Sequence, residues 1–289
     1  MTDAITEHAR GVIERGSLSF TLAARVLDPV ARASGYQLYA WCRHCDDIID
    51  GQTFGHDMQV PSTADQQRLL AGMKATTERA LRGEPVNELV FQGIARVVRR
   101  HAIPERHLFE FLAGMEMDVE GRRYRTVEEL EPYCYRVAGV VGVMMGRIMG
   151  VTDPTTLKRA QDLGTAMQFT NISRDVMDDA AVGRVYLPGE WLEEAGIPEA
   201  EVSRPDRRRA VTAVVSRLLD RAEELYRSAD LGIGHLAFRH AWSIRSARLI
   251  YSEIGTVIRR RGVHAWDTRS RVTGARARRS ARNATTSSS

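Results

Sequence analysis

Apolar residues recur at intervals of three and four along most of the chain, which is the period of an amphipathic helix. Residues 23–49 show this clearly, with apolar side chains at positions such as Val26, Val30 and Tyr36. Pro29 lies near the start of this segment and marks a break there. No segment shows convincingly the two-residue alternation of a half-buried strand. The pattern predicts an all-α protein.

Proline, glycine and capping residues divide the rest of the chain into further helices. Ser62 stands three positions before Asp65, an arrangement typical of a helix start. The predicted helices are 63–81, 86–101, 105–121, 126–149, one that begins at Pro154, one that follows Pro205, and 235–261. A single helical domain over residues 1–272 is the simplest arrangement.

The net charge of +4 is unevenly distributed along the 289 residues. Nine arginines and one acidic residue lie from Arg259 onward, which leaves 32 basic and 36 acidic residues before that point. The body is therefore mildly acidic, and a nucleic-acid partner is not expected. Residues 273–289 are rich in Arg, Ser and Thr, so we expect a disordered basic tail there.

Two other features set the expected environment. The polar N-terminus lacks the apolar core of a signal peptide, and the most apolar stretch, 137–151, is too short to span a bilayer and contains Arg147. These features predict a cytoplasmic protein. Cys42 and Cys45 match the C-x-x-C pattern, but no second pair accompanies them and no strand precedes them, so we interpret them as structural.

Two acidic clusters are the strongest chemical signal. Asp46 and Asp50 form the first, and Asn171, Asp175 and Asp179 form the second. A spacing of four residues places each set on one face of a helix, where like charges repel. Oxygen ligands of this kind suit Mg²⁺ or Mn²⁺, and Mg²⁺ usually completes its shell with substrate phosphate. The clusters predict a metal-bridged diphosphate site between two helices.

A solvent-exposed acidic face is the alternative interpretation of either cluster. The neighbours of both clusters are apolar, however, as in Leu38–Cys42 and Ile48–Ile49. Arg43 lies on the side of Asp46, and Gln168 lies on the stripe of the second cluster. A metal-bound diphosphate is a good leaving group, and its departure from an allylic carbon leaves a carbocation that apolar and aromatic walls must shield from water.

Six segments together resemble the squalene/phytoene synthases. The resemblance extends from about Ser17 to about Arg271, and the segments follow the order of the family. They are 17–20, 39–50, 133–142, 168–179, 183–188 and 247–251, including Asp-Asp-Ile-Ile-Asp at 46–50 and Asn-Ile-Ser-Arg-Asp-Val-Met-Asp-Asp at 171–179.

The resemblance implies an isoprenoid-synthase-type helical bundle around a central cavity. It also implies head-to-head condensation of two geranylgeranyl diphosphates through prephytoene diphosphate to phytoene and two diphosphates. Mg²⁺ or Mn²⁺ is the implied cofactor. NADPH is not expected, because only squalene formation ends with a reduction.

The resemblance assigns roles position by position. Asp46 and Asp50 match the first metal-binding motif, and the second motif is matched by Asn171, Asp175 and Asp179. Asp178 replaces a more usual Glu. Polar or diphosphate contacts are implied for Ser17, Ser19, Arg43, Gln168 and Arg269. Cation stabilisation or proton transfer in the cavity is implied for Tyr39, Tyr133, Tyr251 and Phe20.

Two alternatives stay open at this stage. A dehydrosqualene or squalene synthase acting on farnesyl diphosphate would share the fold and differ in cavity depth. A non-catalytic helical adaptor would use the Arg-rich tail to bind its partner. Because the substrate is a lipid diphosphate, the tail also suggests peripheral attachment to the inner face of a membrane. The oligomeric state is not readable from the sequence.

Overall fold

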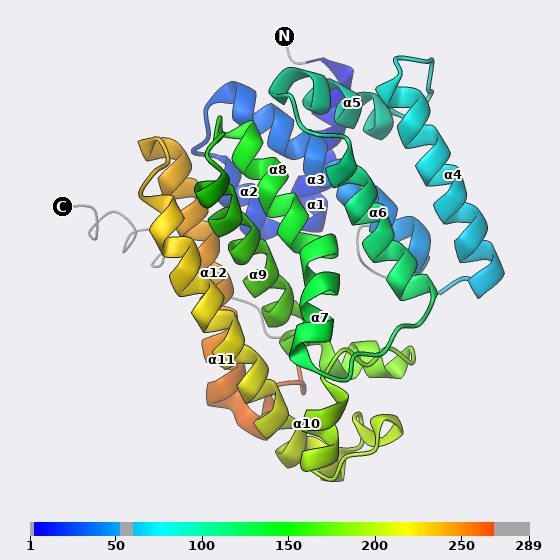
Figure 1. Cartoon of the computed structure of the whole chain (residues 1–289), viewed down its shortest axis with the longest axis vertical. Coiled ribbons are helices and arrows are strands. Elements are labelled where there is room, and N and C mark those ends of the chain that lie inside the picture. The colour runs from blue at the N-terminus through cyan, green and yellow to red at the C-terminus, as the bar shows by residue number, and fades with distance from the viewer. Residues whose placement is uncertain (1–2, 53–59, 269–289) are drawn as a thin grey trace.

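The computed structural model describes residues 3–52 and 60–268, and its regular elements are all helical. This confirms the all-α prediction. Figure 1 shows α8 and α9 in the middle of the molecule, with α11 and α12 on one side and α4 and α6 on the other. The longer elements are α1 (Ala4–Gly16), α2 (Leu18–Ala24), α3 (Pro29–Asp50), α4 (Thr63–Leu81), α5 (Leu89–His101), α6 (Arg106–Val119), α7 (Val127–Cys134), α8 (Val140–Ile148), α9 (Pro154–Ala181), α10 (Gly189–Glu194), α11 (Arg208–Ile233) and α12 (Phe238–Arg261).

Several helices begin at the residues that the sequence singled out as breaks or starts, namely Pro29, Ser62 and Pro154. Asp28 and Asp153 accept backbone hydrogen bonds at the starts of α3 and α9, and each of these helices has proline as its first residue. Helix α4 covers the predicted range, and the Ser62 side chain accepts from the Asp65 backbone N–H. Local side-chain chemistry therefore defines these boundaries.

Other boundaries differ from the prediction. Helices α5 and α12 each begin three residues later than expected, at Leu89 and Phe238. The predicted helix 126–149 is divided into α7, a π-helical segment (Tyr135–Gly139) and α8. Pro132 lies inside α7 and has no N–H to donate, so it weakens the α-helical hydrogen bonding just before the π segment.

Glycines allow α8 and the π segment to pack closely on α9. A Cβ placed on Gly142 would lie 2.2 Å from the Ala160 carbonyl oxygen, and one on Gly164 would lie 2.3 Å from the Ala138 carbonyl oxygen. Backbone therefore contacts backbone, with no room for a methyl group. This contact fixes the position of α9, the helix that carries the second acidic cluster.

Two clusters of buried apolar side chains form the core. One centres on α3, α5 and α6, and the other on α9 and α11. Phe20, Val137 and Ile244 pack against both clusters. All three also line a large cavity, so the cavity lies where the two clusters meet.

Part of the chain remains a matter of prediction. The loop at 51–61 is described only at its ends, and residues 273–289 lie outside the described ranges. The domain boundary at 272 therefore stays a prediction. Among the described helices, none is long and apolar enough to cross a membrane.

Candidate active site

A cavity of about 1090 Å³ runs between α2, α3, α8, α9 and α12. This volume lies at the upper end of the roughly 300–1,000 Å³ that is usual for ligand pockets. One part of its wall is charged and the rest is mostly apolar. The apolar part includes Leu38, Val141, Met145, Leu163, Ile233 and Leu236.

The first acidic cluster lines the charged part of this cavity from α3. Asp46 and Asp50 both line it, as their four-residue spacing predicted. Arg43 lies 3.8 Å from Asp46 and 3.7 Å from Asp47. Asp50 accepts a 2.7 Å hydrogen bond from Arg184, which follows α9 in the chain. The cluster is thus a cavity wall rather than a solvated face.

The second acidic cluster lines the same cavity from α9. Asn171, Asp175 and Asp179 all line it, together with Gln168. Asn171 Nδ2 donates to the Gln168 carboxamide oxygen at 3.3 Å. Arg174 donates twice to Asp175, at 2.8 and 2.5 Å. The predicted polar residues of both helices therefore share one cavity.

Asp118, on α6, is a cavity residue that the sequence reasoning missed. Its carboxylate accepts hydrogen bonds from Tyr133 at 3.0 Å and from Tyr186 at 2.6 Å. Arg184 and Asp50 are close enough to influence its pKa. One signal in the sequence was available, because Asp118 follows Phe111 and Met115 on the apolar stripe of its helix.

Burial raises the pKa of three carboxyl groups in this region. Burial raises the pKa of Asp46 to about 7, against the opposing effect of Arg43. Burial raises the pKa of Asp118 to about 6. The pKa of Asp179 is raised well above its ordinary value, first by burial and then by the charge of Asp175. A cation bound among them would favour their charged forms.

The donor set fits a divalent cation that shares its shell with a ligand. The Asn171 carboxamide oxygen is buried and accepts no hydrogen bond from the described residues, so it is available as a metal ligand. Within the ranges that the structure describes, no group of three or more His, Cys, Asp and Glu side chains is placed to hold a metal ion by itself.

An aromatic group stands next to the charged part of the cavity. The Phe20 ring lies 5.7 Å from that of Tyr251 and 6.0 Å from that of Tyr39, measured between centroids. All three residues line the cavity. The geometry thus brings together three of the four residues predicted to stabilise cations. Tyr133 also lines the cavity but contacts a different group, since it donates a hydrogen bond to Asp118 and stacks on Tyr186.

The predicted contacts of the serines can be located in the structure, whereas that of Arg269 cannot. Ser17 and Ser19 line the cavity, but Ser17 also caps α2 by accepting from the Phe20 backbone N–H at 3.2 Å. Arg269 lies outside the described residues. Cys42, Cys45 and Cys134 are free thiols, and burial raises the pKa of each well above its ordinary value. A structural role for Cys42 and Cys45 agrees with this environment.

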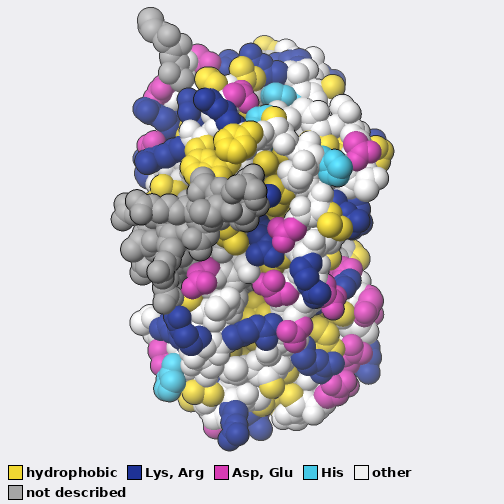
Figure 2. Space-filling view, turned by 90° about the vertical axis from the view of Figure 1, so that its left-hand side faces the viewer, with side chains coloured by type: hydrophobic (Ala, Val, Ile, Leu, Met, Phe, Trp, Pro, Cys, Tyr) yellow, Lys and Arg dark blue, Asp and Glu magenta, His cyan; other side chains and the backbone are white. Residues whose placement is uncertain are grey.

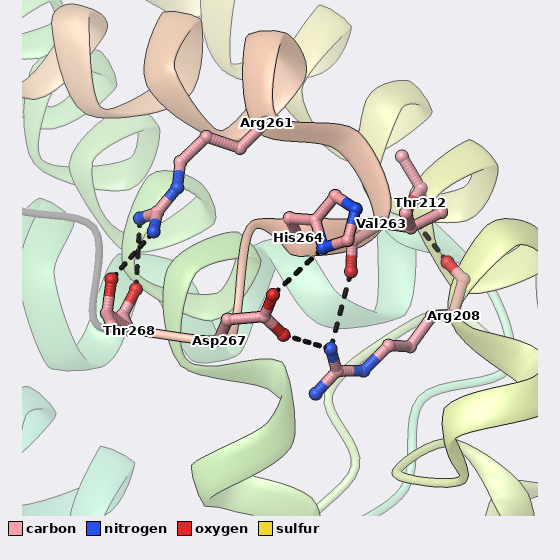
Figure 3. A network of polar contacts seen from close by, with 7 residues as sticks. All are labelled: Arg208, Thr212, Arg261, Val263, His264, Asp267 and Thr268. Atoms are coloured by element: carbon pink, nitrogen blue, oxygen red, sulfur yellow. Dashed lines mark hydrogen bonds and ion pairs between the residues drawn. The ribbon is translucent and has the colours of Figure 1, made fainter.

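The segment that precedes Arg269 is anchored to the second half of the fold. Figure 3 shows Arg208 contacting both Asp267 and the Val263 carbonyl, while His264 contacts Asp267 at 2.9 Å. Trp266 Nε1 donates to the Ser173 carbonyl on α9 at 3.2 Å. The chain therefore leaves the described region close to the helix of the second acidic cluster.

The family model for squalene/phytoene synthases matches residues 13–278 of the chain. A phytoene synthase of Pseudescherichia vulneris is 43% identical over 92% of this chain and 86% of its own length. A 15-cis-phytoene synthase of a Paracoccus species is 46% identical over 88% of this chain and 82% of its own length.

The fold has solved counterparts as well. A crystal structure of a dehydrosqualene synthase in complex with a ligand superposes with a TM-score of 0.87 at 26% identity, covering 98% of this chain and 96% of the other. Fold, cavity and sequence thus agree. The chain belongs to the squalene/phytoene synthase family.

Proposed function

We propose that this chain joins two geranylgeranyl diphosphates head to head and converts the product to phytoene, releasing two diphosphates. The observation that carries this proposal is a single cavity whose wall is charged in one part and apolar elsewhere. Such a cavity suits a molecule with a diphosphate head and a long hydrocarbon chain. Relatives at 41–46% identity are named phytoene synthases, which supports the same product.

Residues in the charged part of the cavity would hold the diphosphate groups of the substrates in two ways. Asp46 and Asp50, with Asn171, Asp175 and Asp179, would hold Mg²⁺ or Mn²⁺, which supplies positive charge to a departing diphosphate. Arg43, Arg174 and Arg184 line the same part of the cavity. Their guanidinium groups can bind phosphate oxygens directly and orient the leaving group.

The proposed chemistry needs no external oxidant or reductant. The C1–O bond of one substrate breaks, and the electron pair leaves with the diphosphate. The allylic cation adds to the double bond of the second substrate, and loss of a proton closes the cyclopropane ring of prephytoene diphosphate. The second diphosphate then leaves, the skeleton rearranges, and loss of a second proton gives phytoene.

The apolar and aromatic walls protect these cations. The faces of Phe20, Tyr39 and Tyr251 offer negative quadrupoles to a nearby positive charge. Burial raises the pKa of Tyr39, so its phenol stays protonated and neutral. The wall residues also exclude water, which would otherwise trap the cation as an alcohol.

Purified protein supplied with geranylgeranyl diphosphate and Mg²⁺ is expected to release a C40 hydrocarbon. The yield should be unchanged by NADPH, because no step is a reduction, and should vanish when a chelator removes the metal. Mass spectrometry of the organic extract measures the product. Protein boiled before the assay is the control, and a hydrocarbon that forms only with NADPH would contradict the proposal.

A second candidate is condensation of two farnesyl diphosphates to a C30 hydrocarbon. The superposition on a dehydrosqualene synthase favours it, since the fold is shared over nearly the whole chain. Equal amounts of the two diphosphates in one assay separate the candidates. We expect C40 product to dominate, and a predominance of C30 product would favour the second candidate instead.

We also propose peripheral attachment to a lipid surface. Leu231 at the end of α11 and Phe238 at the start of α12 are 64% and 74% exposed, and Arg239 beside them is exposed too. Figure 2, which views the side where α11 and α12 lie, shows hydrophobic side chains gathered next to Lys and Arg side chains. This combination suits an anionic bilayer, into which the hydrocarbon product can also dissolve.

The variant Phe238→Glu is expected to lower co-flotation with anionic vesicles by about fivefold, because burying one aromatic ring contributes on the order of 1 kcal/mol or more. Leu69→Glu, at an exposed site on α4, is the matched control and should float like the unmodified protein. A version lacking residues 269–289 measures the contribution of the tail. Unchanged flotation of Phe238→Glu would exclude this surface.

A further inference from the structure

The apolar part of the cavity shares a wall with a second, smaller space. That space has a volume of about 690 Å³ and lies between the α8–α9 connection, the start of α9 and the α11–α12 connection. Six of the described residues line both spaces: Met149, Val151, Thr156, Arg159, Gly232 and Leu236. This second space is partly open to solvent and is lined by polar as well as apolar residues, so a chain that passed this wall would enter a surface groove.

Arg159 is the charged member of this wall and the one with the longest side chain. Its guanidinium donates to the Ser228 hydroxyl on α11 at 2.6 Å and lies 3.7 Å from the Asp162 carboxylate. Neither Ser228 nor Asp162 lines either space. The charged end of Arg159 is thus paired with residues outside both linings, and we infer that its methylene stem forms the wall.

The stem is packed directly on the opposite helix. A Cβ placed on Gly232 would lie 2.5 Å from Arg159 Cβ and 3.1 Å from its Cγ. The start of the Arg159 side chain thus occupies the place that a larger residue at 232 would need. Close packing of this kind leaves no room for a hydrocarbon chain between Gly232 and the start of the Arg159 side chain.

A buried carboxylate keeps the side chain in this position. The Asp162 side chain is only 5% exposed, and it accepts from Ser228 at 2.5 Å and pairs with Lys158. Losing Arg159 from this network would leave Asp162 with fewer compensating charges in a buried place. The network therefore opposes a swing of Arg159 out of the wall.

We propose that Arg159 sets the upper limit of isoprenoid chain length by closing the apolar part of the cavity. This inference rests on the proposed function, because it assumes an isoprenoid substrate. Its physical basis is the second space of about 690 Å³, which has Arg159 in its lining just as the cavity does. With the stem removed, a chain one C5 unit longer than geranylgeranyl diphosphate can extend into that space.

The test compares three variants with the unmodified protein. Arg159→Ala removes the stem, Arg159→Met keeps a stem of similar length without the charge, and Lys158→Ala removes the other cation that pairs with Asp162. Lys158 lines neither space, so this last variant is the matched control. Each protein receives C15, C20 and C25 allylic diphosphates in competition, and mass spectrometry counts the hydrocarbon products.

For Arg159→Ala we expect the ratio of C25 to C20 use to rise at least about tenfold, since a single methylene in an apolar pocket already changes selectivity by about tenfold or more. Arg159→Met and Lys158→Ala should keep the original ratio. An unchanged ratio in Arg159→Ala would overturn the proposal, as would an equal rise in Lys158→Ala. A rise in Arg159→Met as large as in Arg159→Ala would show that stem volume is not the barrier.

A binding measurement separates this inference from the proposed reaction. Calorimetry with unreactive thiodiphosphate analogues of the three chain lengths needs no turnover. Stronger binding of the C25 analogue to Arg159→Ala, but not to Lys158→Ala, would support the role of Arg159 even if no phytoene formed. If the unmodified protein forms phytoene while Arg159→Ala binds the C25 analogue no better, the inference fails and the proposed function stands.

Discussion

Replacing Asp175 by alanine is expected to lower turnover by at least about 10²-fold, the scale seen when one group that stabilises developing charge is removed. Asp175 lines the charged part of the cavity, and it belongs to the α9 cluster that would hold the metal. Its loss would also free Arg174, which donates to it twice. The same reduction is expected for Asp46→Ala on α3, because both clusters face one cavity.

The measurement must separate lost chemistry from lost fold. Hydrocarbon formation gives the turnover, and the far-ultraviolet circular dichroism of each variant reports whether the helices remain. Asp220→Ala is the matched control, since its side chain is 72% exposed on α11 and lies outside the cavity lining. Turnover close to normal in both Asp175→Ala and Asp46→Ala would refute the proposed site.

The acidic clusters were predictable because their geometry is local. Four-residue spacing places Asp46 and Asp50 on one face of any helix, whatever surrounds it. The starts of α4 and α9 were predictable for the same reason, because Ser62 and Pro154 mark them within the local sequence. The apolar neighbours also indicated correctly that these faces line a cavity rather than the outer surface, which removes the basis of the adaptor interpretation.

Contacts between distant segments were beyond prediction from spacing alone. Arg184 and Asp50 are 134 positions apart, yet they form a 2.7 Å hydrogen bond in the cavity. Asp118 contacts Tyr186 across 68 positions. These pairs depend on how α3, α6 and the chain after α9 pack together, and no periodicity within one segment encodes that packing.

The π segment illustrates a different limit. Apolar periodicity continues through residues 126–149, so it cannot distinguish one α-helix from two that are joined by a wider turn. Pro132 lies inside α7, and Gly139, at the end of the π segment, packs against α9. Because a Cβ on Gly139 would lie 2.9 Å from Thr165 Oγ1, tertiary packing shares in fixing this shape.

The variant Gly142→Ala is expected to destabilise the protein by about 1–3 kcal/mol, the usual cost of overpacking a core. Its added methyl group would meet the Ala160 carbonyl oxygen at 2.2 Å, and backbone atoms cannot turn aside as a flexible side chain can. Helix propensity alone would predict that this variant is more stable, since alanine in a helix interior is favoured over glycine by about 0.5–1 kcal/mol. The close contact between α8 and α9 should therefore reverse the normal effect.

Gly72→Ala on α4 is the matched control for that reversal. Nothing lies within 4 Å of a Cβ at this position, so only the propensity gain of about 0.5–1 kcal/mol should remain. Urea unfolding followed by circular dichroism compares the two free energies of unfolding. Because α9 carries Asn171, Asp175 and Asp179, we expect Gly142→Ala to lose turnover as well, whereas Gly72→Ala should keep it. If both variants gained stability equally, the backbone contact would not be what fixes the position of α9.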